Sequence, residues 1–201
     1  IANRIRMWEG THKYIGGGEE SFGWLGYDAV RDKCAPSAIC LICEIAAYAK
    51  DQGISLYDYL LNIYTEFGFQ RETTINVVRP GKAGAEEIQQ MMANYRQNPP
   101  KEIASEKVIR IKDYKSLVEK DFVDGEWREQ PITMALNATS NVLQFFTDGG
   151  LKVSVRPSGT EPKIKFYFEI PADMPTTADY KAATAAAEAR VPAIKASLGL
   201  E

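Results

Sequence analysis

The chain has 201 residues, of which 45% are hydrophobic and 25% are charged. This composition is ordinary for a globular protein, and the length suffices for one domain or for two small ones. The balance of 24 basic against 27 acidic side chains gives a net charge of −3 and a pI near 5.4. Because there is no overall positive field, we expect neither nucleic acid nor an anionic membrane as a partner, and any anion site must be local.

The N-terminal residues, the longest apolar stretch and the cysteines indicate whether the chain is a fragment and where it is located. Residues 1–4 include no initiator Met, basic segment or apolar leader, so we expect a fragment. The longest mostly apolar stretch, residues 38–48, is interrupted by Glu44 and is shorter than the roughly 20 residues that a membrane helix needs. The three cysteines lie close together, which does not resemble the disulfide framework of a secreted protein. We therefore predict a cytoplasmic location.

In the first third of the chain, the sequence pattern predicts three helical segments and a short strand that leads into a glycine-rich loop. Apolar spacing in residues 1–8 indicates the end of a helix, and residues 12–15 are predicted to form a short strand that leads into the loop 16–18. Residues 36–50 carry apolar side chains at three- and four-residue intervals, which predicts a helix. A further helix is expected after Ser55 as its N-cap, and a glycine follows each of the two helices as a stop signal.

Strands predominate beyond a domain boundary that we expect near residue 67. Residues 69–79 are expected to be extended. Strands, several with period-two alternation, are predicted at 107–111, 132–136, 142–147, 152–156 and 163–170. Helices are predicted at 83–96 and from residue 177, where Pro192 should kink or end the second helix. This order of elements predicts an α+β fold, in which helices cover one face of an antiparallel sheet.

The most informative segment is residues 156–162, Arg-Pro-Ser-Gly-Thr-Glu-Pro, which lies between two predicted strands. It combines one fixed cation, two hydroxyls and a flexible glycine with two prolines that restrict the loop. A guanidinium offers bidentate hydrogen bonds, and hydroxyls and backbone N–H groups can line a concave site, so the loop suits a phosphate dianion. A tight hairpin with a surface arginine is an equally good interpretation of the composition alone.

A second candidate is residues 18–23, Gly-Glu-Glu-Ser-Phe-Gly. Adjacent carboxylates and a hydroxyl on a loop flanked by glycines can hydrogen-bond to vicinal sugar hydroxyls, while Phe22 or Trp24 could cover an apolar sugar face. The alternative is a solvated acidic turn before a helix, and the pattern by itself favours that alternative.

Together, these motifs resemble those of the α-D-phosphohexomutases, the phosphoglucomutase/phosphomannomutase family. R-P-S-G-T-E-P followed by K-I-K-F-Y is similar to the phosphate-binding loop of the family's last domain, and G-E-E-S is similar to the sugar-binding G-E-x-S loop of its third domain. Residues 30–33 and 56–58 also resemble the branch that contains bacterial phosphoglucomutases. The resemblance implies that residues 1–67 are the C-terminal remnant of the third, α/β domain and that residues 68–201 are the fourth, phosphate-binding α+β domain.

The resemblance also assigns roles by position. It implies that Glu19 and Ser21 hydrogen-bond to sugar hydroxyls. The residues that it implies for the phosphate that is not being transferred are Arg156, Ser158, Gly159 and Thr160. Lys33 is implied as a cation near the substrate, and Lys163 is a further candidate for the phosphate site. Cys34 stands where the family pattern has Asp, so it lacks a carboxylate that could cap a helix or orient Lys33.

The implied parent enzyme interconverts hexose 1-phosphate and hexose 6-phosphate through a bisphosphorylated sugar. The family's phosphoryl-carrying serine loop and its three-aspartate Mg²⁺ loop have no counterpart in this sequence, so we expect no catalytic residue, no metal site and no activity in the fragment. A phosphosugar and the N-terminal domains of the same enzyme are the expected partners, and a sugar 1,6-bisphosphate is the expected activator. The alternatives are a phosphopentomutase, a sugar-bisphosphate synthase and a non-catalytic phosphosugar-binding module.

Three further signals are interpreted as structural. Cys40 and Cys43 form a C-x-x-C pair in an apolar helix with no second pair, which predicts two core cysteines and not a zinc site. His12 has no Cys, Asp or Glu at ligand spacing and is predicted to be structural or exposed. Lys165 alternates with apolar residues on a predicted strand, which favours simple solvation.

Overall fold

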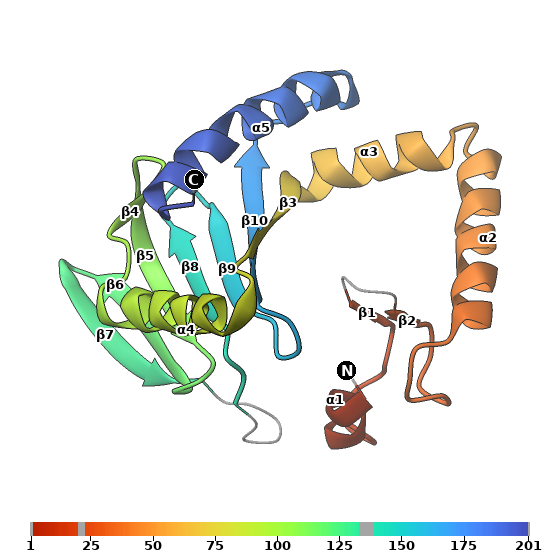
Figure 1. The fold of residues 1–201 in the computed structure, drawn as a ribbon. Helices are drawn as coiled ribbons and strands as arrows, with labels where there is room; N and C mark the ends of the chain where they lie inside the picture. Colours follow the sequence, from red (N-terminus) through yellow and green to blue (C-terminus); the bar gives the residue numbers. More distant parts are fainter. Residues whose placement is uncertain (1, 20–22, 133–138, 201) are drawn as a thin grey trace. The chain divides into compact units, whose positions relative to one another are not determined.

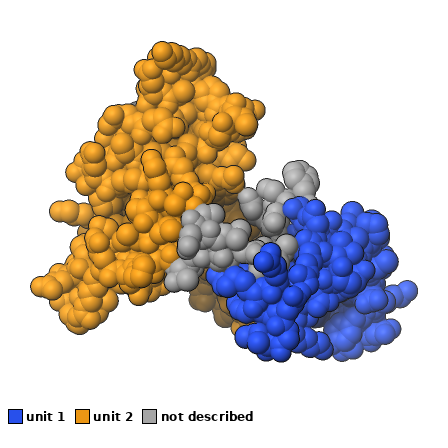
Figure 2. Space-filling view, turned by 90° about the horizontal axis from the view of Figure 1, so that it is seen from below, with its two compact units in different colours: residues 1–63 blue, residues 64–201 orange. Residues whose placement is uncertain are grey.

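The computed structural model describes residues 2–19, 23–132 and 139–200 (Figure 1). The chain divides into two units, residues 1–63 and residues 64–201 (Figure 2). The division falls inside helix α3 (Leu56–Phe67), slightly before the position near residue 67 that the sequence suggested. None of the helices in the described ranges combines the length and the apolar surface that crossing a membrane requires.

Unit 1 contains helices and one small hairpin. Its elements are α1 (Ala2–Met7), β1 (Gly17–Glu19), β2 (Gly23–Leu25), α2 (Ala35–Asp51) and most of α3. Strands β1 and β2 pair in antiparallel fashion. The prediction of a strand at residues 12–15 is wrong, because strand pairing begins only at Gly17, inside the segment expected to be a loop.

The position of Trp24 on β2 explains why β1 and the residue before it are rich in glycine. Its indole lies against the backbone of β1 and of the residue before it, since a Cβ atom at Gly16 or Gly18 would come within 3.0 or 2.9 Å of ring atoms. Such distances are shorter than ordinary van der Waals contacts, so only glycine lets the ring lie this close. The glycines therefore serve the packing of the hairpin, which the apolar pattern of the sequence did not indicate.

The two long helices of unit 1 confirm the predicted helices. Ser55 caps α3, because its Oγ accepts a hydrogen bond from the backbone N–H of Asp58 (3.1 Å). The Asp58 carboxylate in turn accepts hydrogen bonds from the hydroxyl (2.6 Å) and the backbone N–H (3.0 Å) of Ser55. These bonds lower the pKa of Asp58. The arrangement is a capping box that fixes the start of α3.

The prediction that Cys40 and Cys43 lie in the core is wrong, since both are exposed. Helix α2 is apolar around much of its circumference, so the spacing of apolar residues identifies a helix but not its inward face. In the structure Ala49 is fully buried, whereas Ile39 is 62% exposed. The two cysteines share the outward side of the helix with such exposed residues.

Unit 2 is built on an antiparallel eight-stranded sheet with the order β3-β10-β9-β8-β5-β6-β7, to which β4 is added through β5. The strands are β3 (Phe69–Val78), β4 (Glu102–Ile103), β5 (Glu106–Asp113), β6 (Val118–Val123), β7 (Glu126–Pro131), β8 (Leu143–Thr147), β9 (Lys152–Pro157) and β10 (Lys163–Ala172). Four of the five predicted strands are thereby confirmed, and the segment 69–79 that was expected to be extended forms β3. The fifth predicted strand, at 132–136, falls mainly on residues 133–138, which lie outside the described residues.

Helices cover one face of this sheet. They are α4 (Gly81–Gln97) and α5 (Tyr180–Ser197), the latter preceded by the short 3₁₀ helix η1 (Thr177–Asp179) (Figure 1). Residues of both α4 and α5 join one hydrophobic core with the inward side chains of the strands. The fold class is therefore α+β with helices on one face of an antiparallel sheet, as predicted. Helix α5 continues through Pro192, so this proline does not end it.

Strand β10 shows the alternation that separates the two faces. Its inward side chains are all fully buried: Ile164, Phe166, Phe168 and Ile170. Its other side chains are half-buried on the face that lies away from the core: Lys163, Lys165, Tyr167 and Glu169. This polar face leads directly into the loop between β9 and β10.

Tyr95 ties α4 to the end of α5. Its hydroxyl donates a hydrogen bond to the carbonyl oxygen of Leu198 (2.6 Å), and its ring meets the edges of Phe145 and Phe166. Burial raises the pKa of Tyr95 to about 12. The side chain therefore resists ionisation in the folded protein more strongly than in the unfolded chain.

We expect the Tyr95→Phe variant to lose about 1 kcal/mol of unfolding free energy at neutral pH, because the Leu198 carbonyl loses its donor. The raised pKa gives the wild type stability that is complete below about pH 10 and is lost as the pH rises to about 12. Urea unfolding at several pH values across this window should show a steeper fall for the wild type. Equal slopes for the two proteins would contradict this account of Tyr95.

Candidate functional site

The loop between β9 and β10 is held by its own hydrogen bonds. The backbone N–H of Ser158 donates to the carbonyl oxygen of Lys163 (2.8 Å), which closes the loop. The Oγ of Ser158 accepts hydrogen bonds from the backbone N–H groups of Thr160 (3.4 Å) and Glu161 (3.3 Å). It also lies 3.5 Å from Oγ1 of Thr160. The two hydroxyls predicted to bind phosphate are therefore brought together at the tip of the hairpin.

Gly159 lies between these hydroxyls and has free space beside it. A Cβ atom at this position would meet no heavy atom within 4 Å, and Gly159 is not among the residues with positive φ. Neither crowding nor backbone strain within the chain requires glycine here. A glycine does, however, let an external group approach the backbone closely. The loop therefore offers an accessible backbone segment between two hydroxyls.

Arg156 and Lys165 bring two positive charges to the base of this loop. They lie directly opposite each other in the register of β9 and β10. Like charges in such a cross-strand pair are unfavourable unless an anion lies nearby. In the described part of the chain neither residue forms a salt bridge, although Lys165 Nζ lies 6.0 Å from the centroid of the Tyr167 ring. The pair leaves a local excess of positive charge beside the hydroxyls.

The sequence interpretation of Lys165 as a simple solvated lysine missed this juxtaposition. The signal lies in the strand register, which places Lys165 against Arg156 and which single-strand periodicity does not provide. Periodicity shows only which face of the strand a residue occupies. Lys165 is therefore an additional candidate for the anion site.

Lys163 follows the loop and is paired with a carboxylate inside it. Its Nζ forms a salt bridge with Glu161, and its backbone N–H donates to the Glu161 carbonyl oxygen (2.8 Å). The hydrogen bond from Lys163, together with the charges of Lys163 and Lys165, lowers the pKa of the Glu161 carboxyl. Lys163 therefore lies directly beside the loop and is paired with a carboxylate of that loop.

Arg79 reaches the same loop from the end of β3. Its backbone N–H donates to the carbonyl oxygen of Pro162 (2.9 Å), and its Nε lies 3.3 Å from Oε2 of Glu87. Gly84 in the first turn of α4 lies against the backbone of Arg79, since a Cβ atom there would lie 1.9 Å from the Arg79 carbonyl oxygen. Nothing in the sequence signals the contact, since Arg79 and Pro162 are far apart along the chain.

The predicted sugar loop lies in unit 1 and is described only in part. The backbone of Glu19 ends β1 opposite Gly23 of β2. Ser21 lies outside the described residues, and so does the side chain of Glu19. Their predicted roles therefore remain predictions.

Lys33 lies beside the hairpin that carries this loop. A Cβ atom at Gly23 would lie 1.8 Å from Lys33 Cδ, so the absence of a side chain at Gly23 makes room for the lysine stem. Lys33 Nζ lies 3.5 Å from Oδ1 of Asp32, which also accepts the Lys33 backbone N–H (2.7 Å). This backbone hydrogen bond and the charge of Lys33 lower the pKa of Asp32. Asp32 thus gives Lys33 a neighbouring carboxylate.

Cys34 occupies the N-cap of α2 but makes no side-chain cap there. The hydroxyl of Ser37 donates to the carbonyl oxygen of Cys34 (2.9 Å), and hydrogen bonding with Ser37 lowers the pKa of the Cys34 thiol. Residue 34 therefore supplies no carboxylate to the start of α2, and the carboxylate beside Lys33 comes from Asp32.

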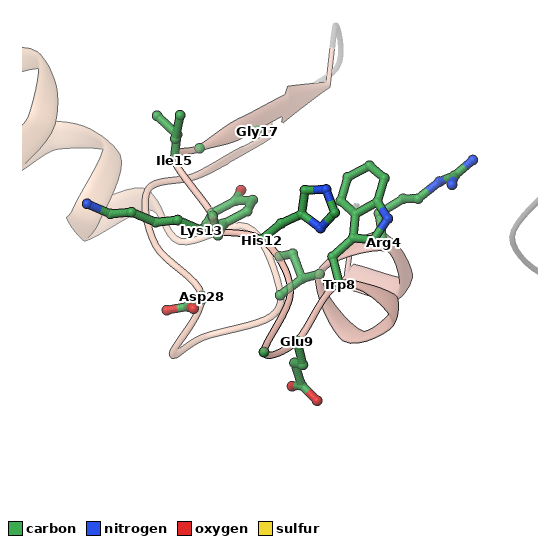
Figure 3. Close-up of a pocket in the computed structure, with 12 residues that line it drawn as sticks. Arg4, Trp8, Glu9, His12, Lys13, Ile15, Gly17 and Asp28 are labelled. Atoms are coloured by element: carbon green, nitrogen blue, oxygen red, sulfur yellow. The ribbon is translucent and has the colours of Figure 1, made fainter.

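A cleft of about 510 Å³ lies beside the glycine hairpin in unit 1 (Figure 3). Its labelled lining residues are Arg4, Trp8, Glu9, His12, Lys13, Ile15, Gly17 and Asp28. The His12 ring packs against Trp8 with 5.3 Å between centroids, and its Nδ1 lies 3.0 Å from Oγ1 of Thr11. The volume falls within the range of small-molecule sites. His12 is exposed, in agreement with the prediction that it is structural or exposed. The sequence did not indicate the cleft.

No metal centre is apparent in the ranges that the structure covers. Residues 2–19, 23–132 and 139–200 contain no group of three His, Cys, Asp or Glu side chains placed to hold an ion. Hard divalent cations such as Mg²⁺ prefer oxygen ligands, of which carboxylates are the main protein source. The described residues do not fit an Mg²⁺ site.

Comparison with known proteins places these features in context. Residues 75–187 match the family model described as "Phosphoglucomutase/phosphomannomutase, C-terminal domain". The chain is 35% identical over 173 residues to a phosphoglucomutase of Staphylococcus haemolyticus and 36% identical over 171 residues to one of Staphylococcus aureus. These matches cover 86% and 85% of this chain, but the chain spans only 30% of the length of each relative.

A solved structure is similar in fold. The match is parafusin, the exocytosis-sensitive phosphoprotein (phosphoglucomutase) of Paramecium, in its open form, with a TM-score of 0.60 and 22% identity. It covers 92% of this chain and 30% of the parafusin chain. At this level of identity the likeness concerns the fold, and it agrees with the antiparallel sheet and helices described above.

Proposed function

Because this chain belongs to the phosphoglucomutase/phosphomannomutase family, we propose that it is the substrate-binding C-terminal part of a phosphohexomutase. In this proposal Arg156 and the loop hydroxyls bind the phosphate of a phosphosugar that is not being transferred, with Lys163 and Lys165 as additional cations. Glu19 and Ser21 bind sugar hydroxyls, and Lys33 lies near the substrate. The observation that carries the proposal is the opposition of Arg156 and Lys165 beside an accessible loop with two hydroxyls.

The chemistry of the loop suits the proposed reaction. Interconversion of hexose 1-phosphate and hexose 6-phosphate through a bisphosphorylated sugar requires the sugar to be bound in two orientations. A site that recognises phosphate by charge and hydroxyl groups, without contacts specific to one sugar carbon, can hold the distal phosphate in both orientations. Positioning of this kind contributes to both phosphoryl transfers, although the loop contacts neither reacting atom.

The remaining parts of the reaction are assigned to the rest of the parent enzyme. We propose that its N-terminal domains supply the phosphoryl-carrying serine and the Mg²⁺ site, that a sugar 1,6-bisphosphate activates it, and that it acts in the cytoplasm. Mg²⁺ would supply charge stabilisation to the transferred phosphoryl group there. This chain would bind substrate but would not turn it over by itself.

A substrate comparison on the full-length parent tests this proposal against its alternatives. Turnover of glucose 1-phosphate or mannose 1-phosphate should exceed that of ribose 1-phosphate. A preference for ribose 1-phosphate would identify a phosphopentomutase, and accumulation of a sugar bisphosphate would identify a bisphosphate synthase. Phosphosugar binding without any turnover would instead identify a binding module. The upstream reading frame gives an independent check, because a phosphoserine loop and an aspartate-rich loop are expected there only for an enzyme.

A further inference from the structure

Glu161 places a negative charge inside the loop assigned above to phosphate. Its carboxylate pairs with Lys163, and this side chain is 56% exposed. A fixed carboxylate repels a phosphate dianion, so its presence in a phosphate site is unfavourable for binding unless it serves another purpose. The hydrogen bond from Lys163 and the charges of Lys163 and Lys165 hold the pKa of the Glu161 carboxyl below its usual range.

The same carboxylate is favourable when the loop is empty. Arg156 and Lys165 oppose each other across β9 and β10, and Lys163 begins the same strand as Lys165. Three cations so close together repel one another, and a nearby anion reduces this repulsion. Glu161 supplies that anion from within the loop. Because Glu161 is exposed to solvent, its interaction with Lys163 is screened, and another anion can replace Glu161 easily.

We propose that Glu161 is an internal counter-anion, which neutralises Lys163 in the empty loop and competes with phosphate for it. This inference rests on the proposed function, because it assumes that phosphate binds at the loop. Because Glu161 competes with phosphate, the loop binds phosphate with moderate affinity. A loop that must release and rebind a phosphate while the sugar changes orientation is served by such moderation, since very tight binding would slow the exchange.

The test is a titration of the 201-residue chain with inorganic phosphate, followed through the amide NMR shifts of Arg156, Ser158, Gly159 and Thr160. Removing the competing charge in Glu161→Gln should lower the Kd about three- to fivefold, the factor that corresponds to an exposed ion pair. Glu126→Gln is the matched control, because it removes the same charge from an exposed residue of β7, which β8, β5 and β6 separate from β9. Its Kd should equal that of the wild type.

Two further arms separate charge competition from a change in loop shape. The gain in Glu161→Gln should shrink as NaCl is added, because salt screens interactions between exposed charges. Glu161→Asp, which keeps the charge, should remain within about twofold of the wild type. Neither result is expected if Glu161 only shapes the loop.

The outcomes distinguish this inference from the proposed function. If phosphate shifts residues 156–160 in the wild type but Glu161→Gln binds equally well or more weakly, the counter-anion role is wrong and the phosphate site stands. A gain that persists unchanged at high salt would also overturn the inference. If phosphate shifts none of these residues in the wild type, the proposed function and the inference are both wrong.

Discussion

Replacement of Arg156 by alanine should raise the Kd of the chain for inorganic phosphate at least about tenfold, because hydrogen bonds to a charged group contribute about 1.5–3 kcal/mol. The guanidinium can bind two phosphate oxygens at once, a geometry that neither lysine nor a hydroxyl reproduces. Arg128→Ala is the matched control. Arg128 is an exposed arginine on β7, at the edge of the sheet, and its loss changes the net charge equally.

The same substitution has a consequence in the full-length parent. Since the loop is proposed to hold the distal phosphate in both half-reactions, Arg156→Ala should impair the conversion of glucose 1-phosphate to glucose 6-phosphate and the reverse reaction alike. Steady-state assays in the two directions provide the measurement. Normal turnover together with a normal KM for glucose 1-phosphate would show that Arg156 does not have the assigned role.

The second large effect concerns stability. Phe166 is fully buried on β10, between β3 and β9, and its ring meets that of Tyr95. Phe166→Ala should therefore lower the unfolding free energy by about 3–5 kcal/mol, through lost burial and the cavity left behind. Urea unfolding followed by circular dichroism measures this loss.

Thr74→Ala provides the control for this prediction. Thr74 is exposed on β3, and its substitution should change the unfolding free energy by no more than about 0.5 kcal/mol. A comparably small loss for Phe166→Ala would mean that β10 is not central to the core. Because the pairing of β10 with β9 also places Lys165 opposite Arg156, such a result would weaken the description of the site as well.

The parts of the fold that could be predicted are those with a strong local pattern. The alternation in residues 163–170 reports a strand with one buried face, and the structure buries that face completely. The hairpin β6–β7 was not predicted, because it lacks such a local pattern. All residues of β7 are exposed, so no apolar alternation marks the strand. Only the turn at Asp124 and Gly125, both with positive φ, carries a local signal for this hairpin.

Some residues of the candidate site could likewise be identified from a local sequence pattern, and others could not. The loop residues 156–162 are contiguous, so their chemistry could be recognised in the sequence and their hydroxyls do meet in the structure. The contributions of Lys165 and Arg79 depend on strand register and on a contact between distant segments, which no local pattern contains. The exposure of Cys40 could not be foreseen either, because apolar spacing does not tell which side of an apolar helix packs inward.

The most direct test of the central claim is an amide NMR titration of this chain with glucose 1-phosphate, with glucose and inorganic phosphate as controls. We predict shifts of residues 156–160 with both phosphate-containing ligands, and shifts of residues 19–21 with glucose 1-phosphate. Glucose alone should leave residues 156–160 unchanged. Absence of any shift at residues 156–160 at ligand concentrations well above a millimolar Kd, or shifts confined to other parts of the chain, would contradict the assignment of the phosphate site.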